Sequence, residues 1–151
     1  MTLHGYTDAD WAGSVVDRKS TSGCYFTCRS ASGRNLKSAA LSTAEAEYIV
    51  TCMACCEVTW LRKLFSELFE HVLDATVILC DNQRGIRLSG NPMFHDQSKH
   101  VDVWYHFIWD MVQQGAVRLD HIGTDEQFVD ILTKPLGKVM FLTFHENLGI
   151  V

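Results

Sequence analysis

The sequence has little proline, no long apolar run and no excess of positive charge, and each absence excludes a class of protein. Only 2 of the 151 residues are proline. No apolar stretch approaches the ~18 residues that a membrane-spanning helix needs. Lys and Arg number 13 against 18 Asp and Glu, a formal net charge of −5. This balance argues against a protein that binds nucleic acid tightly through a broad basic surface.

The first residues lack the basic start and the apolar segment of a secretory signal. We therefore expect an intracellular protein, in the cytoplasm or the nucleus, that is not secreted and does not enter a membrane. In that compartment the six cysteines are expected to be free thiols. Cys52 and Cys55 have zinc-ligand spacing, but a structural zinc site needs four ligands and no second suitable pair follows.

Length and composition predict one globular domain that covers residues 1–151. Hydrophobic residues make up 47% of the chain and charged residues 21%, which is ordinary for a protein with a packed core. The chain has no internal repeat, low-complexity tract or linker-like stretch.

The order of the expected elements predicts an α/β fold with a mixed sheet, because strands come first and helices and strands then alternate. The expected strands lie at 5–8, 23–28, 75–80 and 117–122, with a weak one at 30–38. The expected helices are a long one from residue 43, a short one after the strand at 75–80, one at 101–114 and a last one from about 125.

The start of the long helix is marked by Ser42-Thr43-Ala44-Glu45, which fits a capping box. Apolar residues then recur at steps of three or four and predict one buried stripe along the helix. This stripe consists of Ile49, Met53, Cys56, Trp60 and Leu64.

Two carboxylates follow directly on apolar strands. Asp8 ends the first strand, and Asp81 ends the run Ala75–Cys80. Functional groups gather beyond strand ends in open α/β sheets, and a carboxylate placed there favours compensation by a divalent cation. From spacing alone, Asp81 could equally be the N-cap of the helix that follows it.

Several short motifs, in this order along nearly the whole chain, resemble the ribonuclease H domain of copia-type LTR retrotransposon polyproteins. Together they are far more specific than any one of them. The motifs are Gly5–Gly13, Asp17–Gly23, Ala40–Tyr48, Cys80–Gln83, Lys99–Val103, Tyr105–Ile108 and Phe128–Leu136.

The resemblance implies a ribonuclease H-like fold, with a mixed five-stranded sheet whose first three strands are antiparallel and with helices on both faces. It implies an endoribonuclease that hydrolyses the RNA strand of RNA–DNA hybrids with two ions of Mg²⁺ or Mn²⁺. The implied catalytic and metal-binding residues are Asp8, Glu47, Asp81 and Asp130. The implied partners are the hybrid and an adjacent reverse transcriptase domain; a host-encoded derivative of such an element fits the same motifs.

Two choices among neighbouring acids are open to physical argument. Glu45 and Glu47 are two residues apart and cannot share a helix face, and the capping box accounts for Glu45, which leaves Glu47 for the site. Asp10 could face the same side of its strand as Asp8. Asp8 is favoured because the first acid of the family ends the strand directly.

Residues beside the four acids are candidates for substrate contacts. These are Asp10, Asn82, Gln83, Lys99 and Thr124. Lys99 is equally well explained as a solvated surface lysine.

The chain departs from the family pattern in two places. The stretch between Gly23 and Leu41 is short and lacks a basic run, and Trp104 stands where the family often has a positive charge. These departures favour an alternative in which a weak or inactive ribonuclease H-like remnant binds a protein or nucleic acid. A third hypothesis keeps the fold and changes the substrate, since integrases and transposases share this architecture.

The low positive charge generates a first prediction. We expect weak binding of RNA–DNA hybrid by this chain alone, and loss of that binding as salt rises, because it depends on phosphate contacts that each contribute about one unit to the salt slope. Titration of labelled hybrid in Ca²⁺ measures binding without cleavage. Tight binding that persists at high salt would contradict the prediction.

Overall fold

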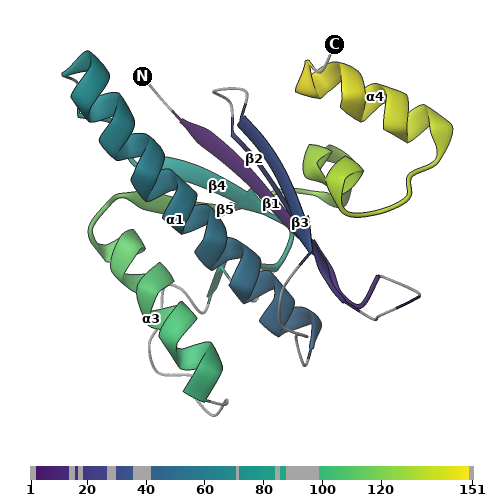
Figure 1. Cartoon of the computed structure of the whole chain (residues 1–151), viewed down its shortest axis with the longest axis horizontal. Coiled ribbons are helices and arrows are strands. Elements are labelled where there is room, and N and C mark those ends of the chain that lie inside the picture. The colour runs from purple at the N-terminus through teal and green to yellow at the C-terminus, as the bar shows by residue number, and fades with distance from the viewer. Residues whose placement is uncertain are drawn as a thin grey trace.

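The computed structural model describes residues 3–13, 16, 19–26, 30–35, 42–70, 72–83, 86–87 and 99–149; the side chains of residues 30–35 and 99–101 lie outside this description. The elements run from a strand-rich first part to an alternating second part (Figure 1). They are β1 (His4–Asp10), β2 (Thr21–Phe26), β3 (Ser30–Asn35), α1 (Thr43–Phe69), β4 (Thr76–Cys80), α3 (Lys99–Gln113), β5 (Val117–His121), the 3-10 helices η1 (Thr124–Glu126) and η2 (Phe128–Leu132), and α4 (Lys138–Leu148).

The strands form one sheet in the order β3-β2-β1-β4-β5. β1 pairs antiparallel with β2, and β2 pairs antiparallel with β3. β4 runs parallel to β1 on one side and to β5 on the other. The sheet is therefore mixed, and the α/β class that the sequence predicts is confirmed. β3 (Ser30–Asn35) lies in the small, polar stretch 30–38, where the sequence pattern alone supports a strand only weakly.

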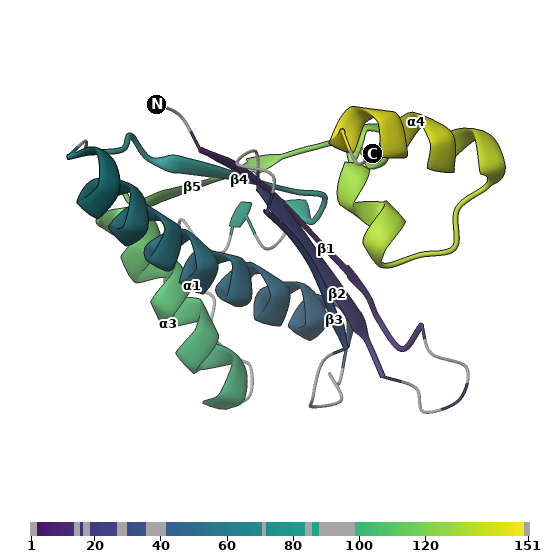
Figure 2. The ribbon, with the colours of Figure 1, turned by 45° about the horizontal axis from the view of Figure 1, so that its top comes forward.

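Helices cover both faces of the sheet. Ala9 of β1 packs with Ala46 and Val50 of α1, whereas the ring of Tyr6 lies 5.6 Å from that of Phe128 in η2. Positions 6 and 9 differ by an odd number, so these side chains point to opposite faces of β1. Figure 2 shows α1 and α3 together on one side and the η2–α4 segment on the other.

The main core lies between the sheet and the pair α1 and α3. Tyr105 and Ile108 of α3 are each 2% exposed and pack with Val58 of α1. Phe26 of β2 and Ile78 of β4 close the cluster from the sheet side. Burial of each such side chain contributes about 2–3 kcal/mol, so this layer holds α1 at a fixed position over β1.

The start of α1 agrees with the expected cap, because Ser42 Oγ accepts a hydrogen bond from the Glu45 N–H at 3.2 Å. The expected apolar stripe is right only in part. Ile49 is buried, but Cys56 is exposed and Trp60 is 58% exposed, and the buried side continues through Ala54, Val58 and Leu61. Apolar residues occupy more than one side of α1, so a stripe displaced around the helix fits the same 3.6-residue period.

The C-terminal part also differs from the expectation of one helix from residue 125. η1 and η2 are two short 3-10 helices separated by Gln127, and α4 follows after Pro135 and Gly137. Proline removes a backbone donor and disfavours helix in the residue before it, which accounts for the break. The short helix expected after β4 is seen only as helical residues 83, 86 and 87, because its surroundings lie outside the description.

Among the residues that the structure describes, none of the helices combines the length and the apolar character that crossing a bilayer requires.

Gly23 lets η2 approach the sheet closely. It pairs with Asp8 across the β1–β2 ladder. A β-carbon at this position would lie 2.9 Å from Cγ2 of Thr133 and 3.1 Å from Cβ of Leu132. The missing side chain of Gly23 therefore sets the depth at which the end of η2 lies over Asp8.

We predict that Gly23→Ala lowers the free energy of unfolding by about 1–3 kcal/mol, because the added methyl group overpacks the η2 contact. Gly123→Ala is the matched control: a β-carbon there meets no atom within 4 Å, and we expect a change within about 0.5 kcal/mol. Urea unfolding of both variants measures the difference. Equal stabilities would show that η2 does not depend on Gly23.

Candidate metal centre

The site lies at the part of β1 that extends beyond the end of its neighbouring strand β4. β1 pairs with β2 as far as Asp10 and Thr21, but it pairs with β4 only as far as Tyr6 and Leu79. β4 ends at Cys80, so the last part of β1 has no strand on that edge. Side chains from both faces of the sheet can meet at this open edge.

At Thr7, where β1 has no neighbouring strand on the β4 edge, the side chain of Gln127 takes the place of a strand as the hydrogen-bond donor. The Leu3 carbonyl accepts a hydrogen bond from the Val77 N–H, and the two-residue period of a strand points the Thr7 carbonyl to the same edge. There it accepts a hydrogen bond from Nε2 of Gln127 at 2.8 Å. The Gln127 side chain is fully buried. It therefore satisfies the strand edge and ties the η1–η2 segment to β1.

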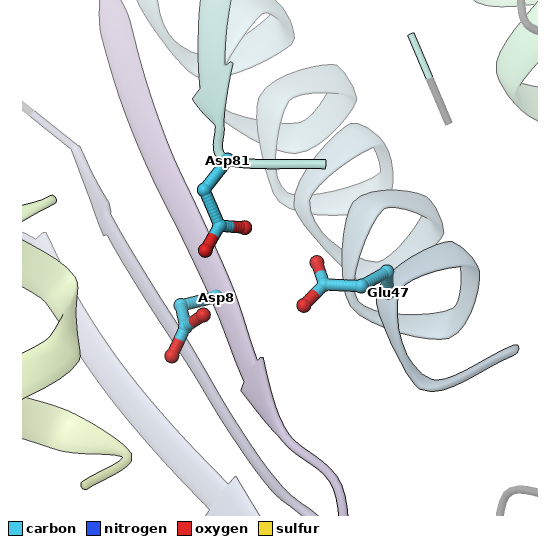
Figure 3. Close-up of side chains that lie close together, drawn as sticks. All are labelled: Asp8, Glu47 and Asp81. Atoms are coloured by element: carbon cyan, nitrogen blue, oxygen red, sulfur yellow. The ribbon is translucent and has the colours of Figure 1, made fainter. Parts of the chain in front are cut away.

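Three carboxylates converge at the open edge (Figure 3). Asp8 comes from β1, Glu47 from the first turns of α1, and Asp81 from the residue after β4. One carboxylate oxygen from each lies within 4.8 Å of the others. Residues that are far apart in the sequence thus form one acidic group. Asp81 follows a strand end as expected, whereas Asp8 lies within β1, which continues to Asp10.

Burial and mutual repulsion raise the pKa values in this group. Burial raises the pKa of Glu47 from its ordinary 4.5 to about 8, and the charges of Asp81 and Asp8 add to the effect. A hydrogen bond from the Ala9 backbone and the charge of Lys134 lower it in part. Glu47 therefore holds a proton near neutral pH when no cation replaces it.

Asp81 is affected in the same direction. Burial raises its pKa, and the charge of Asp8 raises it further, while Lys134 opposes the shift. The three acids repel one another, so the group favours any cation that can enter it.

Asp8 is also held from the other face of the sheet. Nζ of Lys134 lies 3.1 Å from each carboxylate oxygen of Asp8 and 3.3 Å from Oδ1 of Asp130. Thr133 Oγ1 donates a hydrogen bond to Oδ2 of Asp8. Asp130 is only 3% exposed, and burial and the charge of Asp8 raise its pKa. Lys134 therefore links the fourth expected acid to the other three.

The donor set fits a hard divalent cation. Carboxylate oxygens are the ligands that Mg²⁺ and Mn²⁺ accept. Oε2 of Glu47 is buried and has no hydrogen-bond partner among the residues that the structure describes. A buried carboxylate oxygen without a partner is costly, and a cation at this position would satisfy it.

Asp10 lies away from this group. It is half-buried near the end of β1, and its carboxylate folds back over the following turn. A β-carbon on Gly13 would lie 1.9 Å from Oδ2 of Asp10. Asp8, and not Asp10, is the β1 acid that contacts the other carboxylates.

Of the other candidates for substrate contacts whose side chains the structure describes, only Asn82 is seen beside the acidic group. Asn82 is half-buried and lines a small hollow beside Glu47. Gln83 and Thr124 are exposed. Lys99 begins α3, and its side chain lies outside the described residues.

Sequence reasoning missed three residues that hold the site: Gln127, Thr133 and Lys134. Lys134 could have been found, because it stands four residues after Asp130, the spacing of an ion pair on one helical turn. Gln127 has no such pattern, because its partner is a backbone carbonyl 120 residues away in the sequence.

Comparisons with known proteins agree with this architecture. The retrovirus-related Pol polyprotein from transposon RE2 of Arabidopsis thaliana is 39% identical over 155 residues, which cover 100% of this chain and 11% of the polyprotein. The corresponding protein from transposon TNT 1-94 of Nicotiana tabacum is 40% identical over 152 residues, 98% of this chain and 11% of that protein. The chain is homologous to copia-type retrotransposon Pol polyproteins. It spans about a tenth of the length of the curated relatives it matches, and no family model matches it.

Among solved structures, the ribonuclease H1 called LC11, crystallised in complex with RNA/DNA hybrid, superposes with a TM-score of 0.63. The two chains are 13% identical, and the match covers 87% of this chain and 94% of the other. This retrotransposon Pol homologue therefore has a ribonuclease H-like α/β fold.

The raised pKa of Glu47 predicts that the metal-free protein loses stability as pH rises. The pKa is about 8 in the folded chain and 4.5 ordinarily, so the folded chain keeps a proton that the unfolded chain releases. The contribution is full below pH 4.5 and declines up to about pH 8. We expect a loss on the order of 2 kcal/mol or more between pH 5 and 8.

Glu47→Gln remains neutral and should flatten this dependence, and Glu45→Gln should retain it. Urea unfolding in EDTA at several pH values measures the slope for each protein. A slope for Glu47→Gln equal to that of wild type would contradict the assignment of the proton to Glu47.

Proposed function

We propose that this chain is a metal-dependent ribonuclease H domain that hydrolyses the RNA strand of RNA–DNA hybrids. The observation that carries the proposal is the convergence of Asp8, Glu47 and Asp81 at the open edge of β1. The ribonuclease H-like fold and the homology to retrotransposon Pol polyproteins support it.

Asp8, Glu47 and Asp81 are the residues that would hold a divalent ion, and Asp8 and Asp130 would hold a second. Bound Mg²⁺ or Mn²⁺ would supply Lewis-acid neutralisation of the phosphate and an activated water. Glu47 must lose its proton to become a ligand, so uptake of the ion releases protons. Asp8 would serve both positions, because it lies within 4.8 Å of Glu47 and Asp81 and is hydrogen-bonded to Asp130.

The protein contributes position and charge. η2 and α1 hold Asp130 and Glu47 on opposite faces of β1, and Asp8 lies between them. Hydrolysis of the phosphodiester by this chemistry leaves a 5′-phosphate and a 3′-hydroxyl. Selection of RNA would come from 2′-hydroxyl groups and from the shape of the hybrid minor groove.

Among the candidate substrate contacts, Asn82 lies beside Glu47 in a small hollow, and Gln83 and Thr124 are exposed. We propose that these side chains contact the sugar and phosphate groups that flank the cut. Asp10 and Lys99 are weaker candidates, because the carboxylate of Asp10 points toward Gly13.

We further propose that the domain acts beside a reverse transcriptase domain of a larger Pol protein, inside the cell. The net charge of −5 leaves little to hold the duplex away from the cut. A tethered neighbour that binds the same hybrid raises the effective concentration of substrate at the site.

Asp81→Asn tests the proposed function. We expect a loss of hybrid cleavage of at least about 100-fold, with a fold as stable as wild type or more stable, because the change removes repulsion with Asp8. Gel analysis of an end-labelled hybrid in Mg²⁺ or Mn²⁺ measures cleavage. Glu45→Gln is the control on the same acidic region and should cleave like wild type, because glutamine still serves a capping box.

Equal cleavage by wild type and Asp81→Asn would refute the site. If neither protein cleaves hybrid in either metal but both bind it, the alternative of a binding module derived from a ribonuclease H-like ancestor is favoured. Single-stranded RNA and DNA duplex of the same sequence serve as substrates that should resist cleavage.

A further inference from the structure

Lys134 stands where a second divalent ion would have to enter. Its ammonium nitrogen lies 3.1 Å from the carboxylate oxygens of Asp8 and 3.3 Å from Oδ1 of Asp130. Asp8 and Asp130 are almost fully buried, and the Lys134 side chain is 32% exposed. A single positive charge therefore occupies the space between two buried acids.

The backbone of η2 fixes the position of Lys134 relative to Asp130. The Lys134 N–H donates to the Asp130 carbonyl at 2.9 Å, which continues the turn of η2 and sets the side chain of Lys134 above that of Asp130. Thr133, next to it, donates to Asp8. Two successive residues thus hold the η2 side of Asp8.

The four acids are consequently unequal. Asp8, Glu47 and Asp81 offer oxygens within 4.8 Å of one another, and Oε2 of Glu47 has no hydrogen-bond partner in the described part of the chain. Asp130 lies outside that group; its carboxyl group is hydrogen-bonded to that of Asp8, and Lys134 contacts both. The side of Asp8 that faces Glu47 and Asp81 is open to a cation, whereas the side that faces Asp130 is occupied by the ammonium group of Lys134.

We propose that Lys134 is a built-in cation that closes the Asp8–Asp130 side of the site to a second divalent ion until the lysine side chain withdraws. The substrate-free protein then binds one ion tightly, at Asp8, Glu47 and Asp81, and a second ion only weakly. Lysine suits this role because its charge is carried on a flexible four-carbon chain, and its partial exposure leaves it a route to solvent. Lys134 is a positioning residue, and its role rests on the proposed function of the site.

Mn²⁺ binding to the full 151-residue chain tests this role without substrate and without cleavage. Electron paramagnetic resonance counts free Mn²⁺, and calorimetry gives the affinity of each site. We expect wild type to bind one ion tightly, and Lys134→Met to bind the second about tenfold more tightly than wild type or better. Lys138→Met is the matched control, because Lys138 is an exposed lysine at the start of α4, and it should behave like wild type.

The outcomes separate this inference from the proposed function. If Lys134→Met and wild type bind both ions with equal affinity while Asp81→Asn loses the first, the inference is overturned and the metal centre stands. If neither wild type nor Lys134→Met binds Mn²⁺, the proposed function fails and the inference fails with it.

Lys134→Met leaves two buried acids unpaired and could fail to fold, so a measurement on wild type is needed as well. Nuclear magnetic resonance of ¹⁵N-lysine reports the Nζ protons of Lys134, assigned by comparison with Lys134→Arg. We expect the protected Nζ signal to persist through the first equivalent of Mg²⁺ and to disappear with the second. A signal unchanged at saturation with two ions would overturn the proposal.

Discussion

The burial of one negative charge is the constraint on which the rest of this structure depends. Asp8 is 1% exposed in the middle of a sheet, and an ionised carboxylate in that position is stable only if paired and hydrogen-bonded. Lys134 and Thr133 supply the pair and the hydrogen bond. Removal of a partner from such a pair costs about 3–5 kcal/mol. The placement of η2 over β2, which Gly23 permits, is therefore part of the energetics of Asp8.

Three forms of positive charge compete for the same acids. A proton occupies Glu47, an ammonium group occupies the space between Asp8 and Asp130, and a divalent ion fits the remaining oxygens. In the absence of metal, the first two keep the like charges from forcing β1, α1 and η2 apart. On the proposed function, metal uptake would therefore be coupled to proton release from Glu47 and to the position of Lys134.

The sequence was informative where local chemistry decides the structure. The cap at Ser42 and the position of Asp81 after β4 could be predicted because a side chain or a strand end fixes each of them. Asp8 does not end its strand as expected: β1 continues to Asp10, and only its pairing with β4 stops before Asp8. The buried stripe of α1 could be phased only at its start, because beyond the buried Ile49 the residues Met53 and Trp60 compete with Ala54 and Val58 as the inner face. Only the packing of α3 and the sheet decides between them.

The C-terminal segment shows a different limit. The run from Asp125 has the composition of a helix, but η1 and η2 are held as short 3-10 turns by tertiary contacts, among them Gln127 to Thr7 and Thr133 to Asp8. These contacts join residues more than a hundred positions apart, and no pattern in a single sequence predicts them. Such contacts override local propensity.

The early end of β4 makes the site depend on the length of a strand as well as on its side chains. Because Asp81 follows Cys80 directly, one added residue in β4 would turn this carboxylate to the opposite face of the sheet. The longer strand would also compete with Gln127 for the edge of β1. Replacements within Val77-Ile78-Leu79 alter packing alone. Among active relatives, insertions and deletions between positions 76 and 81 should therefore be far rarer than exchanges of one apolar residue for another.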